Sequence, residues 1–415
     1  MRRPRLAAAL IAGAIFPRTL LAAPPPRPAM TIDRLVLDHG LRIILARMPD
    51  APSVGIALAI EGGLSIEDGT HAGWSLAVLG EHAMRGDLAP AVRSALLTRR
   101  GLSENVEIGG RAAFHTWNAP PDELPLALYL TGQSLREPRW DDASARLAEI
   151  AAATVSSPWD AARRAFFSDH GQGRSPASSA GLSIWDQRLR SSPAALAVVG
   201  DVDGDRVAEW VHRYLDGGAS RGPSVPVADA ASLDPAPPVL GRAFAVVLAA
   251  RISGTADKRR GLRAAFDAFV ETRLVGATPK SARALAAVKT SMLTVNRLDE
   301  PGNGGDLVAV RVTFSDADGL ARAAAQLRAE LAAFLNEGPS AGELAAAYAR
   351  QDTRDDLTSA DPQALAARLA CGELEGDPRA SLLRRRPLLR EAIVPLLRPA
   401  FGGTDLRWLE ERPRP

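Results

Sequence analysis

The sequence is poor in cysteine and in aromatic residues, and it carries almost no net charge. Its single cysteine, Cys371, excludes an internal disulfide. Lysine and arginine number 50 against 48 aspartate and glutamate residues, and four of the arginines lie in the first 23 residues. A chain this close to neutral has no electrostatic footprint for nucleic acid or for an anionic membrane. We therefore expect neither as a partner.

The N-terminus is basic and then apolar. An apolar run from Leu6 to Phe16 follows the first arginines, and small residues lead up to Ala23. These are the parts of a secretory signal peptide, which we place at residues 1–23. A retained anchor is the alternative, but the run is shorter than the roughly 20 apolar residues that span a bilayer, and no later segment is long enough. The Arg2-Arg3 pair leaves Sec and twin-arginine export both open. The alanine- and arginine-rich usage is typical of GC-rich bacteria, so we expect a periplasmic protein.

Hydrophobic periodicity predicts a mixture of strands and helices in the first half. Alternating apolar residues over 32–46 predict a hairpin, and residues 53–60 predict a third strand. The apolar segment Gly73–Arg85 is too long for an edge strand and predicts a buried helix. Further helices are expected at 124–135, 141–154 and 205–215, with an apolar strand at 195–199.

The pattern then repeats. Residues 217–239 are rich in Gly, Ser, Ala and Pro and predict a linker between a first domain, 30–216, and a second, 240–415. Leu135-Arg-Glu-Pro138 recurs as Leu335-Asn-Glu-Gly-Pro339, about 200 residues later, which indicates a duplicated domain. The second half is expected to contain strands at 243–249 and 307–314, and helices at 261–274, 320–335 and 340–351.

Three phrases occur in order along the chain. They are Leu37-Asp-His-Gly-Leu-Arg-Ile-Ile-Leu45, Gly73-Trp-Ser-Leu-Ala-Val-Leu-Gly-Glu-His-Ala-Met-Arg-Gly86 and Leu196-Ala-Val-Val-Gly-Asp-Val-Asp203. Together they resemble the M16 family of zinc peptidases, which includes pitrilysin, insulin-degrading enzyme and mitochondrial processing peptidase. The resemblance covers roughly residues 32 to 370. It implies an α+β fold with two homologous M16-type domains, each an antiparallel sheet backed by helices.

The zinc motif of that family, H-x-x-E-H, falls on residues 78–82. Histidines at i and i+4 share one helix face, and the glutamate beside them activates a metal-bound water. The resemblance makes Glu81 the general base, His82 a zinc ligand and Glu149 the third ligand, but Val78 stands where the first histidine should be. Catalytic zinc normally has three protein ligands. We therefore expect weak or absent zinc, with all three polar residues vestigial.

The other histidines are poor candidates to replace the missing zinc ligand. The resemblance puts the strand 109–118 beside the site, although this strand lacks part of the family's usual substrate-side segment. We expect its His115 to be half-exposed and only a surface residue. His71 lies 11 residues before His82, about 16 Å along a helix axis, too far to share an ion. The remaining histidines are expected on the solvated surface: His39, His170 and His212.

The second half has also lost part of the family's site. There the family supplies an arginine and a tyrosine that bind the substrate carbonyl and support the tetrahedral intermediate. The matching phrase places Lys280, the candidate substrate-binding residue, at the arginine position and Ala287 at the tyrosine position. Alanine donates no hydrogen bond to an oxyanion, and such a donor contributes about 3 to 4 kcal/mol.

Losses in both halves favour a pseudopeptidase. We expect an exported subunit that pairs with an active M16 homologue, or with itself, and shapes its chamber or holds unfolded peptide by strand addition at a sheet edge. Two alternatives stay open. One is an active zinc-dependent metalloendopeptidase with an altered ligand set, supported only by Glu81, His82 and Glu149. The other is a free-standing peptide-binding or assembly protein in which those three residues have structural roles.

Val78→His tests this interpretation directly. It places imidazoles at i and i+4 with Glu149 opposite, so zinc affinity should rise by orders of magnitude. Turnover need not return, because Ala287 and Lys280 still leave the oxyanion poorly bound. Zinc titration measures the gain. A variant that is folded by circular dichroism but gains no zinc binding would contradict the placement of Glu149 as third ligand.

Overall fold

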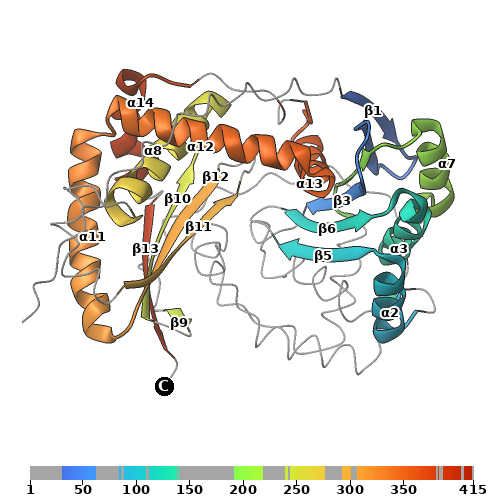
Figure 1. The fold of residues 1–415 in the computed structure, drawn as a ribbon, viewed down its shortest axis with the longest axis horizontal. Helices are drawn as coiled ribbons and strands as arrows, with labels where there is room; N and C mark the ends of the chain where they lie inside the picture. The colour runs from blue at the N-terminus through green and yellow to red at the C-terminus, as the bar shows by residue number, and fades with distance from the viewer. Residues whose placement is uncertain are drawn as a thin grey trace, which may run out of the picture.

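The computed structural model describes residues 30–61, 84–85, 88–108, 112–136, 138–139, 191–217, 239–241, 244–275, 292–300, 306–379, 382, 387–402 and 406–413. Two sheets, one from each half of the chain, are each covered by helices (Figure 1). None of the helices in these ranges is long and apolar enough to cross a membrane.

The first sheet has six strands in the order β1-β2-β8-β3-β6-β5. β3 and β8 lie at its centre, and every residue of these two strands is buried. The continuous apolar runs in both sequences are typical of strands that are covered on both faces. The strands are β1 (Thr31–Val36), β2 (Arg42–Arg47), β3 (Val54–Glu61), β5 (Ser103–Ile108), β6 (Ala112–Ala119) and β8 (Ala194–Gly200).

Helices α3 (Leu124–Arg136) and α7 (Gly204–Leu215) cover one face of this sheet. The carboxylate of Asp203 caps α7 by accepting hydrogen bonds from the backbone N–H groups of Asp205 and Arg206 at 3.0 and 3.3 Å. Val207 and Val211 then face the sheet, where they join a core that includes Trp117. A third helix, α2 (Pro90–Arg100), connects to β5.

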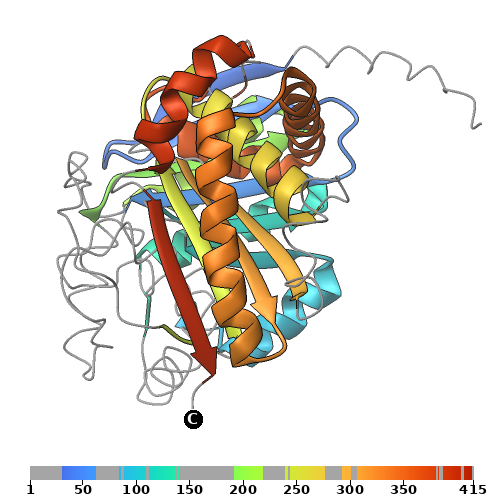
Figure 2. The same ribbon diagram turned by 90° about the vertical axis from the view of Figure 1, so that its left-hand side faces the viewer.

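The second sheet has the order β11-β12-β10-β13-β9. Its strands are β9 (Val239–Gly241), β10 (Phe244–Ile252), β11 (Met292–Glu300), β12 (Asp306–Phe314) and β13 (Leu406–Pro413). Helices α8 (Ala256–Phe269), α11 (Ala317–Glu337) and α14 (Arg390–Phe401) pack on one face of it, and Figure 2 shows α11 lying over β10, with β13 beside the helix. A π-helical turn, Val270–Val275, continues α8.

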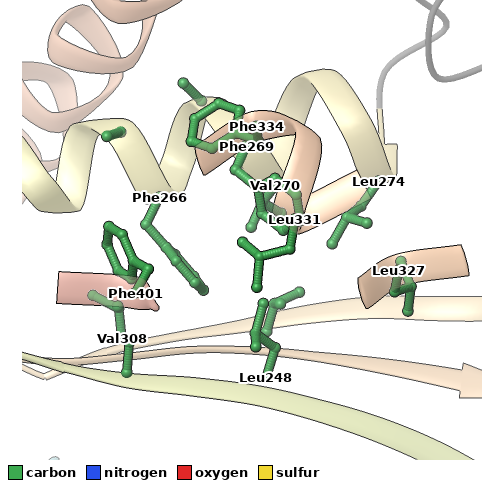
Figure 3. Packing of buried hydrophobic residues seen from close by; sticks show 14 of the residues in the cluster. Leu248, Phe266, Phe269, Val270, Leu274, Val308, Leu327, Leu331, Phe334 and Phe401 are labelled. Carbon is green, nitrogen blue, oxygen red and sulfur yellow. The ribbon is translucent and has the colours of Figure 1, made fainter. Parts of the chain in front are cut away.

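Aromatic rings fill the core between these helices and the sheet (Figure 3). Phe269 of α8 meets Phe334 of α11 with ring centroids 5.3 Å apart, and Phe266 meets Phe401 of α14 at 5.9 Å. Edge and tilted contacts of this kind add to the stabilisation from buried apolar area. Three helices are thereby fixed to one another as well as to the sheet.

The two sheets share one topology, which confirms the predicted duplication. β2, β8, β3, β6 and β5 of the first sheet correspond in order to β9, β13, β10, β12 and β11 of the second. In each sheet the first two of these strands pair in parallel and the others pair antiparallel. The expected antiparallel sheets are therefore present, each with one parallel pair.

A helix from the second half covers the free face of the first sheet. Helix α12 (Ala341–Ala360) runs from the second half towards this sheet, and α13 (Pro362–Leu374) follows it and packs against β3 and β8 (Figure 1). The contact is made of small and aliphatic side chains from both sides: Ile44, Ala46, Ala57, Ala59, Ala197, Val199, Leu365, Ala366, Leu369 and Ala370.

Hydrogen bonds fix both ends of α13. At its start, the Gln363 side-chain amide donates to the Thr116 hydroxyl at 2.9 Å. At its end, Arg34 donates to the Glu373 carboxylate at 2.6 Å, and Arg42 donates to the Glu373 backbone carbonyl at 2.8 Å. A guanidinium at a helix C-terminus also complements the helix dipole. These contacts join segments more than 240 residues apart in sequence.

Most predicted elements are present with boundaries shifted by a few residues, but one expectation was wrong at its end. The helix predicted at Gly73–Arg85 does not reach Arg85, because Met84–Arg85 forms a short strand, β4, that pairs with β7 (Pro138–Arg139). The rest of that helix, the helix predicted at 141–154 and most of the linker lie outside the described residues. Several elements had not been predicted: α2, β5, β11, α13, α14 and β13.

Gly55→Ala should weaken the docking of α13. A Cβ atom at residue 55 would lie 2.1 Å from the backbone carbon of Pro362. The start of α13 would therefore have to move off β3, and we expect the free energy of unfolding to fall by about 3 kcal/mol in urea denaturation. Gly342→Ala is the matched control, since nothing lies within 4 Å of its Cβ. In helix α12 it should leave stability unchanged or raise it by up to about 1 kcal/mol.

Candidate functional site

The predicted site residues Val78, Glu81, His82, Glu149 and Lys280 all lie outside the described residues. Their roles therefore remain predictions. The structure does describe two short strands close to them in sequence: β4, which follows His82, and β7, which precedes Glu149.

β4 and β7 bring two of the relevant segments together. Met84, two residues after His82, pairs with Arg139, ten residues before Glu149, and Arg85 pairs with Pro138. Both short strands contact α3. The described ends of the two segments predicted to carry the base and the ligands therefore meet beside α3.

A buried cluster of polar side chains lies at the β5 edge of the same sheet. Nε2 of His115 is 2.6 Å from Oε1 of Glu104, and Nε of Arg93 is 3.7 Å from Oε2 of the same carboxylate. The side chains of His115, Glu104 and Arg93 are 2, 10 and 4% exposed. We call these three residues the edge cluster. One carboxylate is thus placed between a guanidinium and an imidazole.

Strand register explains how two of these side chains meet. His115 of β6 is opposite Val106, and Trp117 is opposite Glu104. His115 and Glu104 are therefore diagonal neighbours, and both point to the face that α2 and α3 cover. The His115 and Trp117 rings lie 4.8 Å apart, which completes the apolar surround.

Arg93 reaches the cluster from α2. This helix begins with Pro90 at its first position and ends at Arg100, and the next residue, Gly101, has a left-handed φ of 69°. Proline at the start and glycine at the end are typical helix boundaries, so the signal was present in the sequence. Burial lowers the pKa of Arg93, and the charge of Glu104 opposes this effect. The arginine nonetheless stays cationic, since guanidinium groups are not deprotonated in proteins.

Two histidine expectations were wrong. His115 is buried rather than half-exposed, because Glu104 of β5 lies against its ring and Arg93 of α2 lies against Glu104. His39 is also buried, although it lies in the hairpin turn. His212 is on the surface as expected, with Nδ1 3.0 Å from a carboxylate oxygen of Asp216. His71 and His170 lie outside the described residues.

The edge cluster does not fit a zinc ion. It offers one imidazole and one carboxylate, and the guanidinium of Arg93 repels a cation at that place. Nε2 of His115 is already bonded to Glu104. Across the ranges that the structure describes, no three His, Cys, Asp or Glu side chains lie close enough to hold a metal ion.

In the second half, α8 has a structural role. α8 follows β10 as the segment 73–85 follows β3, and it is joined to α12 by two ion pairs. Arg260 of α8 is 2.6 Å from Asp352, and Arg354 of α12 is 3.1 Å from Asp267. Since α8 carries neither histidine nor glutamate, its polar contacts with α12 hold the two helices together and provide no second ligand set.

Comparisons with known proteins locate the fold. No protein-family model and no curated protein matches the sequence. A protease from Helicobacter pylori has a TM-score of 0.71 at 12% identity, over 92% of this chain and 100% of that one. An inactive domain of peptidase M16 from Pseudomonas fluorescens has a TM-score of 0.66 at 13% identity, over 93% and 98%. The first half of the periplasmic protease PqqL from Escherichia coli has a TM-score of 0.62 at 15% identity, over 92% of each chain.

Arg93→Leu should expose how much the edge cluster depends on paired charges. It removes the guanidinium beside the buried carboxylate of Glu104, and losing one partner of a buried pair costs about 3 to 5 kcal/mol. Thermal or urea unfolding measures the change. The double variant Arg93→Leu, Glu104→Leu removes both charges and should recover most of the loss. A double variant no more stable than the single one would contradict the assignment of these two residues as a charge pair.

Proposed function

We propose that this chain, which has the fold of the M16 peptidases, is an exported non-catalytic subunit that works in the periplasm with an active M16 homologue in peptide processing or degradation. One observation carries the proposal. An M16-like fold with one sheet in each half of the chain coincides with valine at residue 78, where the resemblance places the first zinc ligand. A peptidase that needs three ligands for its zinc is compromised by that loss.

Two of the solved structures support the parts of this proposal. The Pseudomonas fluorescens domain is an M16 domain described as inactive, so the fold is compatible with a role other than hydrolysis. PqqL is a periplasmic protease, which agrees with the signal peptide expected at residues 1–23. Fold alone does not assign function, so the case depends on the residues at the site.

A non-catalytic subunit needs a way to contact peptide, and β5 offers one. Among the described strands, β5 pairs only with β6, so its outer edge has backbone N–H and C=O groups without a strand partner there. An extended peptide can add to such an edge through main-chain hydrogen bonds. β11 has the equivalent edge position in the second sheet. We therefore infer that unfolded peptide is held by strand addition, with β5 as the first candidate.

Zinc and peptide cleavage test the loss of catalysis. The purified mature chain should hold well under one zinc per chain after dialysis, measured by mass spectrometry, because two ligands do not retain the ion against water. It should not cleave unstructured peptides. Stoichiometric zinc, or cleavage that disappears in Glu81→Gln, would instead establish the active enzyme with an altered ligand set. Cleavage that survives Glu81→Gln indicates a contaminating protease.

Assembly is tested separately. An M16 homologue with an intact H-x-x-E-H motif, encoded next to this chain, should co-elute with it in size-exclusion chromatography when the two are mixed. The proposed pairing requires a complex whose peptidase activity differs from that of the homologue alone. If the mature chain elutes as a monomer with every such homologue but still binds peptide, it is a free-standing peptide-binding protein.

A further inference from the structure

The sequence of β5 has a low intrinsic propensity for strand structure. It has six residues, and it begins with Ser103, Glu104 and Asn105, which are residues poorly suited to strands. Within the described part of the chain, β6 is its only strand neighbour. Edge strands of this kind open more readily than central ones.

The edge cluster compensates for this weakness. The carboxylate of Glu104 belongs to β5, and it contacts both neighbouring elements, α2 through Arg93 and β6 through His115. With Glu104 ionised, Nε2–H of His115 donates the 2.6 Å hydrogen bond. Charge-assisted bonds are about twice as strong as neutral ones, and burial strengthens them further. The side chain at the second position of β5 is thus fixed from two sides.

We propose that the edge cluster positions β5 to accept an extended peptide, with Arg93, Glu104 and His115 as positioning residues rather than peptide contacts. This inference rests on the proposed strand addition at β5. All three side chains lie on the face of the sheet that α2 and α3 cover, at 10% exposure or less. They therefore leave the main-chain edge of β5 to the peptide.

The physical reason is preorganisation. A peptide that adds to a rigid strand orders only itself, whereas a peptide that adds to a fraying strand must also order the strand. Each ordered residue costs roughly 1 to 2 kcal/mol of conformational entropy. Fixing β5 in advance therefore raises peptide affinity without a new contact to the peptide.

The test compares two variants of one residue in the full mature chain. His115→Leu fills the same place with an apolar side chain, which donates no hydrogen bond to Glu104. His115→Gln has a side-chain amide that restores a donor. Hydrogen–deuterium exchange over residues 103–108 measures the opening of β5, and fluorescence anisotropy with a labelled unstructured peptide measures affinity. Val207→Ala is the control, because Val207 is fully buried in α7 and lies outside the cluster.

We expect His115→Leu to accelerate exchange over 103–108 and to weaken peptide affinity about tenfold, the effect of one lost hydrogen bond to a charged group. His115→Gln should stay near wild type in both measurements. Val207→Ala should lower the unfolding temperature but leave the peptide affinity unchanged. If His115 acted only through overall stability, the two variants would instead weaken peptide affinity alike.

Two results would overturn the inference. In one, exchange over 103–108 is the same in His115→Leu and wild type. In the other, β5 opens faster but peptide affinity is unchanged, so the peptide binds elsewhere. If wild-type protein binds no peptide at all, the proposed function fails. The exchange measurement then still decides whether the cluster holds β5.

Discussion

Among the described elements, the packing of α13 on the first sheet is the main contact between the two duplicated halves. Small residues such as Ala57 and Ala59 of β3 let the helix approach closely, and Gly55 lets its first turn lie against the strand. Without α13, the described structure would leave the central strands β3 and β8 apolar on an uncovered face. The relative placement of the halves therefore depends on a helix that belongs in sequence to one half and in space to the other.

Duplication has produced two sheets with one topology and different chemistry. In the second half, ion pairs such as Arg260 with Asp352 join α8 to α12, so α8 has a structural role. In the first half, the corresponding segments carry Glu81, His82 and Glu149. Two sheets of one topology thus accompany structural ion pairs in the second half and, in the sequence of the first half, the residues that resemble a metal site.

The charges of the edge cluster differ from those of the predicted metal site. Arg93 brings a permanent positive charge to the carboxylate of Glu104, which stabilises the buried anion and opposes any cation. His115 is committed to the same carboxylate. The cluster is consequently suited to holding β5 and α2 together, and the replacement ligand that an active enzyme requires is not supplied by this histidine.

The sequence by itself determined the strands and helices with strong periodicity, the duplication, and the resemblance that places Val78 at a ligand position. It did not determine β5, because Ser103, Glu104 and Asn105 show no apolar alternation, nor that β5 would bury His115. It also did not reveal that α13 would cross to the other half. Periodicity reports which side of a segment is apolar, but pairing between Glu104 and His115, and between α13 and β3, depends on which distant segments share a face, and only the tertiary structure decides that.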